Sequence, residues 1–113
     1  MHEMSLCESI VRTLEEQAGV QDYRRVRTVW LEIGALAGVE PRALRFGFDV
    51  VTRGTLAEQA RLEIVGLPGE AWCFDCQQTV EVAQRFDPCP RCQGFRLQVT
   101  GGDQMRIKEL EVE

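Results

Sequence analysis

The chain has 113 residues, of which 44% are hydrophobic and 27% are charged, and its formal net charge is −5. This length suits one ordinary domain, or a small domain plus a module too small to hold a core unaided. The composition is typical of a folded soluble protein, no apolar run is long enough to cross a bilayer, and the negative charge disfavours a nucleic-acid partner.

The first predicted element is an amphipathic helix over residues 5–18. Its apolar stripe at helical spacing consists of Leu6, Ile10, Val11, Leu14 and Ala18. We expect Ser5 and Glu8 to form a capping box at its start and Gly19 to end it. Cys7 lies beside the stripe, which favours a buried apolar thiol over a metal ligand or nucleophile.

Two strands and a second helix follow. Residues 26–33 alternate as a half-buried strand does, with one face made by Val29, Leu31 and Ile33. Pro41 is well placed as the first residue of a helix that runs to about Arg53 and stops at Gly54. The predicted buried stripe of this helix contains Leu44, Phe46, Phe48, Val50 and Val51. Residues 61–66 form a second strand by alternation.

The most specific motif is a pair of Cys-x-x-Cys sequences twelve residues apart. Each can close a tight turn, here called a knuckle, and two facing knuckles supply four soft donors in a tetrahedron. We therefore predict a structural zinc site made by Cys73, Cys76, Cys89 and Cys92. Iron is the alternative, because a Cys-Pro-x-Cys-x-Gly knuckle fits either metal. Disulfides and a thioredoxin-like redox pair are disfavoured, since neither a secretory signal nor a βαβ pattern is present.

These elements predict an α+β fold with a small sheet of about three strands and two helices, plus an inserted zinc-ribbon-like four-cysteine module. The module is expected at residues 70–97, within an α/β domain formed by 1–69 and completed by 98–113. Residues 105–112 alternate with a bulge and should return to the sheet of that domain. Exchange of this strand between two chains would give a weak, strand-swapped dimer instead of a monomer.

The N-terminus has the composition of a metal chelate. The α-amine of Met1, with the backbone nitrogen and the imidazole of His2, can close two fused rings around one metal, and Glu3 can supply a backbone nitrogen or a carboxylate. This nitrogen-rich square-planar set suits Ni(II) or Cu(II). His2 is the only histidine in the chain, so the cysteine site has no local imidazole to exchange for a thiolate, and we expect a rigid zinc.

Along nearly its whole length the chain resembles the hydrogenase nickel-incorporation proteins of the HypA/HybF family. The matching segments are the Met1-His2-Glu3-Met4-Ser5 start, Glu32-Ile33-Gly34, Val39-Glu40-Pro41, Phe48-Asp49-Val50-Val51, Gly54-Thr55, both Cys-x-x-Cys pairs and Met105-Arg106-Ile107-Lys108. A four-cysteine module alone is common, but one inserted between this start and this closing strand is specific.

The resemblance implies a cytoplasmic metallochaperone, not an enzyme, that binds Ni(II) at its N-terminus and passes it towards a nickel–iron hydrogenase. It implies His2 as the indispensable nickel ligand, with contributions from Met1 and Glu3, and an extra carboxylate at Glu40 in some members. Before Pro41, however, Glu40 is equally explained as a helix N-cap. The implied partners are a GTPase of the HypB family and the hydrogenase large subunit, with no membrane.

Two other functions compete with this interpretation. A zinc-ribbon module for nucleic acid should present a basic, aromatic face, but the module mixes Arg85, Arg91 and Arg96 with Asp75, Glu81 and Asp87. An iron electron carrier would be red, whereas zinc protein is colourless. The sequence has no Gly-rich phosphate loop, so nucleotide hydrolysis would belong to a partner.

Overall fold

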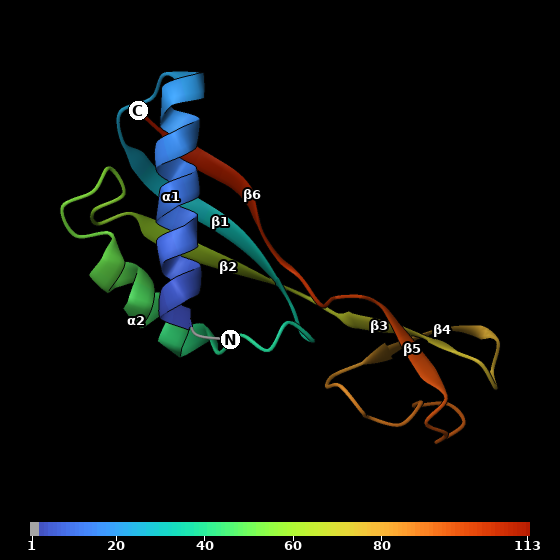
Figure 1. The fold of residues 1–113 in the computed structure, drawn as a ribbon. Coiled ribbons are helices and arrows are strands. Elements are labelled where there is room, and N and C mark those ends of the chain that lie inside the picture. The colour runs from blue at the N-terminus through green and yellow to red at the C-terminus, as the bar shows by residue number, and fades with distance from the viewer. Residues whose placement is uncertain (1–2) are drawn as a thin grey trace. The chain divides into compact units, whose positions relative to one another are not determined.

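A computed structural model describes residues 3–113 (Figure 1). The elements in chain order are α1 (Glu3–Gln21), β1 (Val26–Gly34), α2 (Pro41–Val51), β2 (Arg61–Leu67), β3 (Gly69–Cys73), β4 (Gln78–Val82), β5 (Leu97–Gly101) and β6 (Met105–Val112). Within these residues the strands form two three-stranded sheets, in the orders β2-β1-β6 and β4-β3-β5. The predicted α+β class, with two helices, a three-stranded sheet and a four-cysteine module, is confirmed.

The chain separates into two compact units. The first contains the residues through Leu31 with 39–64 and 107–113, and the second contains 32–38 and 65–106. We call the second the cysteine unit. It is larger than the predicted module because β5 pairs with β3 and because the end of β1 joins it. Compactness does not show that a unit folds alone, so the domain boundaries stay a prediction.

In the first unit, α1 lies along one face of the sheet in Figure 1. Its buried side chains are Cys7, Ile10, Val11 and Leu14. The central strand β1 is buried beyond the alternation that its sequence predicts, since Thr28 is only 3% exposed. A strand between two others is covered along both edges, and the Thr28 hydroxyl is satisfied because it donates to Glu111 Oε1 at 2.7 Å.

The predicted ends of α1 are wrong at both termini. The helix runs over Glu3–Gln21, so Ser5 lies inside the first turn and cannot be its cap. An acidic residue in the first turn, here Glu3, favours the earlier start because it complements the helix dipole. At the other end the helix passes through Gly19 and stops before Asp22, which has a φ of 59°. The Tyr23 hydroxyl then donates to the carbonyl of Leu14 at 2.7 Å and fixes the connection to β1.

Helix α2 starts at Pro41 as predicted and ends at Val51, with Thr52 as its C-cap. The Glu40 carboxylate is the N-cap, since its Oε2 accepts from the Ala43 N–H at 2.6 Å. The prediction that Phe46 widens the buried stripe is wrong, because this ring is 68% exposed. Position 46 lies about 200° around the helix from Leu44, on the opposite face.

The cysteine unit has its own small core. In its sheet, the central β3 places Ala71 opposite Val80 of β4 and Val99 of β5, both antiparallel. The buried core residues are Leu36, Ala71, Cys73, Val80, Val82 and Cys89. Two of these six are predicted metal ligands, so the core and the metal centre of this unit are the same structure.

Candidate metal centre

The four predicted cysteine ligands come from two places in the cysteine unit. Cys73 ends β3 and Cys76 lies in the turn to β4, whereas Cys89 and Cys92 lie in the loop between β4 and β5. The antiparallel β3–β4 hairpin fixes the first knuckle, and the pairing of β5 with β3 returns the loop to it. The sheet therefore brings the second knuckle opposite the first.

Both knuckles have the same backbone. The Gln77 N–H donates to the Cys73 carbonyl and the Gln93 N–H donates to the Cys89 carbonyl, each at 2.8 Å. Both glutamines have positive φ, 53° and 64° respectively. Backbone N–H groups also point at the sulfurs, with Cys76 donating to Cys73 Sγ and Arg91 donating to Cys89 Sγ, both at 3.4 Å. This turn is the one that the Cys-x-x-Cys spacing predicts.

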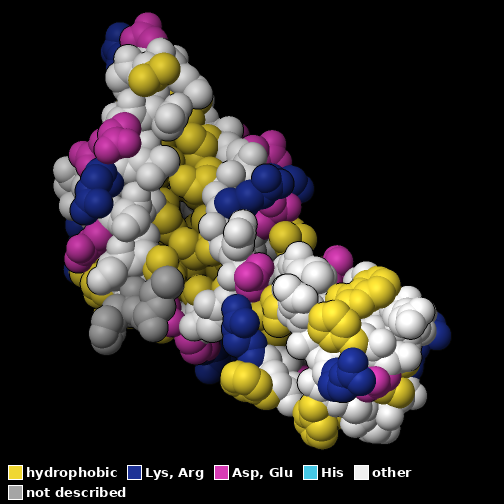
Figure 2. Space-filling model, turned by 45° about the vertical axis from the view of Figure 1, so that its right-hand side comes forward, with side chains coloured by type: hydrophobic (Ala, Val, Ile, Leu, Met, Phe, Trp, Pro, Cys, Tyr) yellow, Lys and Arg dark blue, Asp and Glu magenta, His cyan; other side chains and the backbone are white. Residues whose placement is uncertain are grey.

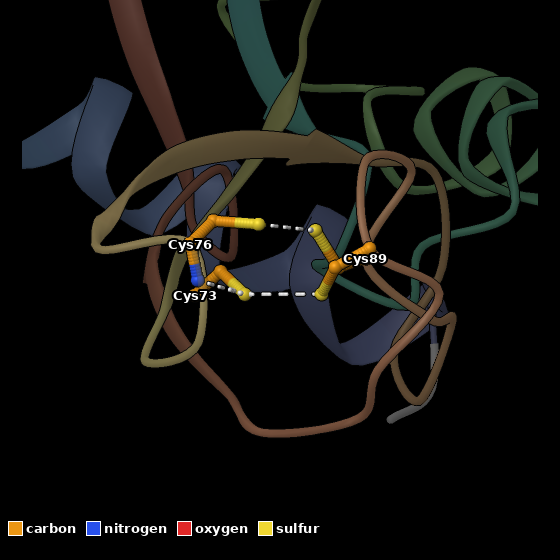
Figure 3. Close-up of side chains that lie close together, drawn as sticks. Cys73, Cys76 and Cys89 are labelled. Atoms are coloured by element: carbon orange, nitrogen blue, oxygen red, sulfur yellow. Dashed lines mark hydrogen bonds between the residues drawn. The ribbon is translucent and has the colours of Figure 1, made fainter.

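The four sulfurs surround one point. Cys73 Sγ lies 3.7 Å from Cys92 Sγ, and Cys76 Sγ lies 3.9 Å from Cys89 Sγ. All four ligand atoms lie within 4.8 Å of one another, and Figure 3 shows the sulfurs of the labelled Cys73, Cys76 and Cys89 turned inward. Metal–sulfur bonds of about 2.3 Å in a tetrahedron place sulfurs about 3.8 Å apart. The distances fit one metal ion and exclude disulfides in this structure, where all the cysteines are free.

The environment of the thiols also fits a cation. Backbone N–H groups of Cys92 and Arg91 stabilise the thiolate and lower the pKa of Cys89 to about 7. Burial, and then hydrogen bonds with the other three cysteines, raises the pKa of Cys76 to about 12. Without a metal the four sulfurs therefore cannot all be thiolates at neutral pH. A divalent ion would compensate their charge and release the remaining protons.

Four thiolates complete a tetrahedral shell and leave no open position for a substrate. Cys73 and Cys89 are buried, Cys76 is half-buried and Cys92 is exposed. This arrangement suits a structural ion that supports the core of the unit. The donor set is chemically compatible with both zinc and iron.

The predicted N-terminal site is described only in part, because Met1 and His2 lie outside the described residues. Glu3 lies in the first turn of α1, and its Oε2 accepts from the Glu40 N–H at 3.1 Å. Glu40 in turn caps α2. The carboxylate of Glu3 therefore connects the start of α1 to the start of α2. The sequence predicts Glu3 as a metal ligand through its backbone nitrogen or its carboxylate. It gives no signal for the bond to Glu40, which lies 37 residues further along the chain.

Comparison with known proteins gives the family. A family model described as "Hydrogenase/urease nickel incorporation, metallochaperone, hypA" matches residues 1–112. The chain belongs to the HypA family. Its family is thus one of metallochaperones for nickel and not of enzymes, and the predicted resemblance is confirmed.

Curated relatives are similar to this chain along their whole length. The "Hydrogenase maturation factor HypA" proteins of Azotobacter chroococcum and Azotobacter vinelandii are 63% and 62% identical to this chain over 113 residues, which is 100% of each protein. The solution structure of the Ni metallochaperone HypA from Helicobacter pylori is similar to this structure with a TM-score of 0.71 at 24% sequence identity. The match covers 99% of this chain and 97% of the Helicobacter pylori chain. A second HypA solution structure has a TM-score of 0.72 at 25% identity, with 100% and 97% covered. The fold of the family is therefore present here.

No helix among residues 3–113 is both long and apolar enough to cross a membrane.

Proposed function

We propose that this protein binds Ni(II) at its N-terminus and delivers it during maturation of a nickel–iron hydrogenase, while Cys73, Cys76, Cys89 and Cys92 hold a structural zinc. The observation that carries this proposal is the match of the nickel-metallochaperone family model over residues 1–112, which includes the Met1-His2-Glu3 chelate. The hydrogenase as the enzyme served follows from the names of the full-length relatives.

In the proposed nickel site, the amine of Met1 and the backbone and imidazole nitrogens of His2 bind the cargo ion. Glu3 contributes its backbone nitrogen as the fourth donor. The first N–H groups of a helix are not used by helical hydrogen bonds, so nickel can replace the Glu3 proton without opening α1. The Glu3 carboxylate, which accepts from the Glu40 N–H, positions this segment against α2.

Two features of the proposed site weaken nickel binding and so favour release of the ion. A cation at a helix N-terminus opposes the helix dipole by about 0.3–1 kcal/mol. The imidazole and amine must also be deprotonated to bind, so affinity should fall as pH drops below about 6.5. Both effects favour a site that holds nickel for transfer rather than permanently.

Zinc is the proposed occupant of the four-cysteine centre, because it favours closed tetrahedral thiolate sites and has no redox chemistry. The zinc supports the core formed around Cys73 and Cys89. The proposed partners are a GTPase of the HypB family and the hydrogenase large subunit, and the proposed location is the cytoplasm, where unpaired cysteines persist.

The deciding experiment is a calorimetric Ni(II) titration of the protein with its native Met1, compared with a version that carries two extra residues before it. We expect about one nickel per chain with Kd near micromolar for the first, and a large loss of affinity for the second. A His2→Ala variant should behave like the extended protein. Equal nickel binding by all three would place nickel elsewhere and overturn the proposal.

Metal analysis of the purified protein tests the assignment of zinc to the four-cysteine centre. About one zinc per chain in a colourless protein, unchanged in the extended and His2→Ala versions, is the expected result. A red protein with iron would contradict the zinc assignment while leaving the nickel titration valid.

A further inference from the structure

A small apolar pocket opens on the cysteine unit, and none of the four metal-binding cysteines lines it. Its volume is about 190 Å³. The floor is formed by the sheet residues Ala71, Val82, Leu97 and Val99, and two aromatic rings, Phe86 and Phe95, line its rim. Sites for drug-sized molecules have about 300–1,000 Å³, so this pocket has room for one large side chain rather than a small-molecule ligand.

The fold does not explain why a phenylalanine occupies position 86. Phe86 has a φ of 70° and is 94% exposed. The left-handed region disfavours residues with a Cβ, and glycine or asparagine would suit this turn better. The turn itself is held by Asp87, whose N–H donates to the Gln84 carbonyl at 3.3 Å and whose Oδ2 accepts from the Gln84 N–H at 3.1 Å. The phenyl ring thus adds strain and exposed apolar surface at this turn.

Phe95, which also lines the pocket, is a second exposed aromatic residue. Its ring is 72% exposed, and Figure 2 shows hydrophobic side chains at the surface of the cysteine unit next to basic and acidic groups. Exposed aromatic rings around a concave apolar floor are typical of the centre of a protein–protein interface.

The charge at the rim identifies the chemistry of the occupant. Arg85 lines the pocket and is exposed, and within residues 3–113 it forms no hydrogen bond or ion pair. By contrast, Arg96 pairs with Asp75 at 3.0 Å. The other rim charge, Asp87, is committed to the Gln84 N–H. An unpaired guanidinium beside an apolar pocket favours a carboxylate on the partner, in a bidentate pair.

We propose that this pocket is a docking site for a segment of another protein that inserts one bulky apolar side chain between Phe86 and Phe95 and places a carboxylate on Arg85. With a single anchor and a single ion pair the contact is weak and transient, with Kd on the order of 10 μM to 1 mM. The proposal goes beyond nickel binding and needs only the folded cysteine unit.

The test uses the full-length, zinc-loaded, nickel-free protein and three terminally blocked peptides. The sequences are Gly-Glu-Glu-Phe-Glu-Glu-Gly, the same peptide with lysine for glutamate, and the same peptide with serine for phenylalanine. Two-dimensional amide NMR should show saturable shifts at Phe86, Phe95 and Leu97 with the acidic phenylalanine peptide. The serine peptide should cause none, and the lysine peptide should bind at least tenfold more weakly.

Two variants separate docking from folding. Phe86→Gly should remove the strained ring, so the protein should be at least as stable as the wild type and yet bind the acidic peptide at least fivefold more weakly. The control Phe46→Ser removes another exposed ring, which lies on α2 and is 68% exposed, and this variant should bind normally. Unchanged binding by Phe86→Gly, or shifts of the same signals by an eight-nucleotide oligothymidine but not by the peptide, would overturn the proposal.

Discussion

Gln77 and Gln93 occupy equivalent positions immediately after the two knuckles, and both have positive φ. The Cys-x-x-Cys spacing predicts the two turns, because the sulfurs of each pair converge only if the chain reverses after the second cysteine. It does not predict the residue that follows. Glycine would adopt this conformation without strain, so each glutamine is a local site of excess free energy that the metal centre overcomes.

Replacing Gln93 by glycine should therefore stabilise the cysteine unit. We expect Gln93→Gly to raise its free energy of unfolding by about 0.5–1 kcal/mol, since relief of the left-handed strain exceeds the entropy that glycine adds to the unfolded chain. Hydrogen exchange of the β3 amides in metal-loaded protein measures this. The control Gln98→Gly, in the strand β5 where φ is not positive, should lower stability by about 0.5–1 kcal/mol. Destabilisation by both would show that the knuckle is unstrained.

Two variants of Glu40 distinguish its role as a helix N-cap from a role as a metal ligand. Glu40→Ala should lower stability by about 1 kcal/mol, because the Ala43 N–H loses its acceptor. Glu40→Asn retains a good N-cap and should preserve both stability and nickel affinity. Urea unfolding and nickel titration of the two variants check this. A tenfold loss of nickel affinity in Glu40→Asn, with unchanged unfolding, would make the carboxylate a ligand after all.

At the scale of elements, three backbone segments of the cysteine unit meet at glycines. They are the end of β1, the connection between β5 and β6, and the connection between β2 and β3 at Pro68. The end of β1 passes the β5–β6 connection, where the Gly34 N–H donates to the Gln104 carbonyl at 2.9 Å and the Leu36 N–H donates to the Gly102 carbonyl at 2.7 Å. A Cβ on Gly34 would overlap the backbone of Gly102, and a Cβ on Gly102 would overlap the Pro68 carbonyl. The backbones are in contact, so no side chain larger than hydrogen fits.

This crossing should tolerate no Cβ. Gly102 also has a φ of 73°, so Gly102→Ala combines a clash with strain and should cost at least about 2 kcal/mol. A Cβ on Gly66 meets nothing within 4 Å, and Gly66→Ala should be neutral or slightly stabilising. Chemical denaturation of both variants in the metal-loaded state makes the comparison. Equal stability would show that the crossing relaxes.

At the scale of the molecule, the sheet β4-β3-β5 belongs to the cysteine unit, whereas the first unit contains the larger part of β1, β2 and β6. The two units differ in what stabilises them. The first unit buries apolar stripes from two helices. The core of the cysteine unit has six buried residues, two of which are cysteines of the metal centre. We expect a core this small to depend on a bound metal, since metal–thiolate bonds supply much of the folding free energy of small metal-binding modules.

Removal of the metal should thus unfold one unit and spare the other. After treatment with a strong chelator at pH 7, we expect the amide NMR signals of β3, β4 and β5 to collapse while those of α1 and α2 keep their positions. One equivalent of Zn(II) should restore the lost signals. Unfolding of the whole protein in a single step would show instead that the units form one cooperative domain, and would contradict the predicted division of the chain.

The sequence by itself determined the features that depend on short-range chemistry. Four thiols in two close pairs, a proline and a carboxylate at the start of α2, and the alternation of β2 and β6 each depend on residues a few positions apart. The order of α1, β1, α2, β2 and β6 and the metal-binding character of residues 73–92 therefore followed from local patterns alone, whereas β3, β4 and β5 were not predicted as separate strands. The same local rules misplaced the ends of α1. The predicted cap Ser5 and the predicted stop Gly19 both lie inside the helix, which runs over Glu3–Gln21.

Only the tertiary structure decided the features that join distant parts of the chain. These include the pairing of β5 with β3, the bond from Glu3 to the Glu40 N–H, the burial of Thr28 in a central strand and the pocket between Phe86 and Phe95. None has a local signature, because the periodicity of a strand shows which side chains share a face but not which strand lies beside it. The partner is chosen by the burial and hydrogen bonding of the whole fold, which no short segment contains.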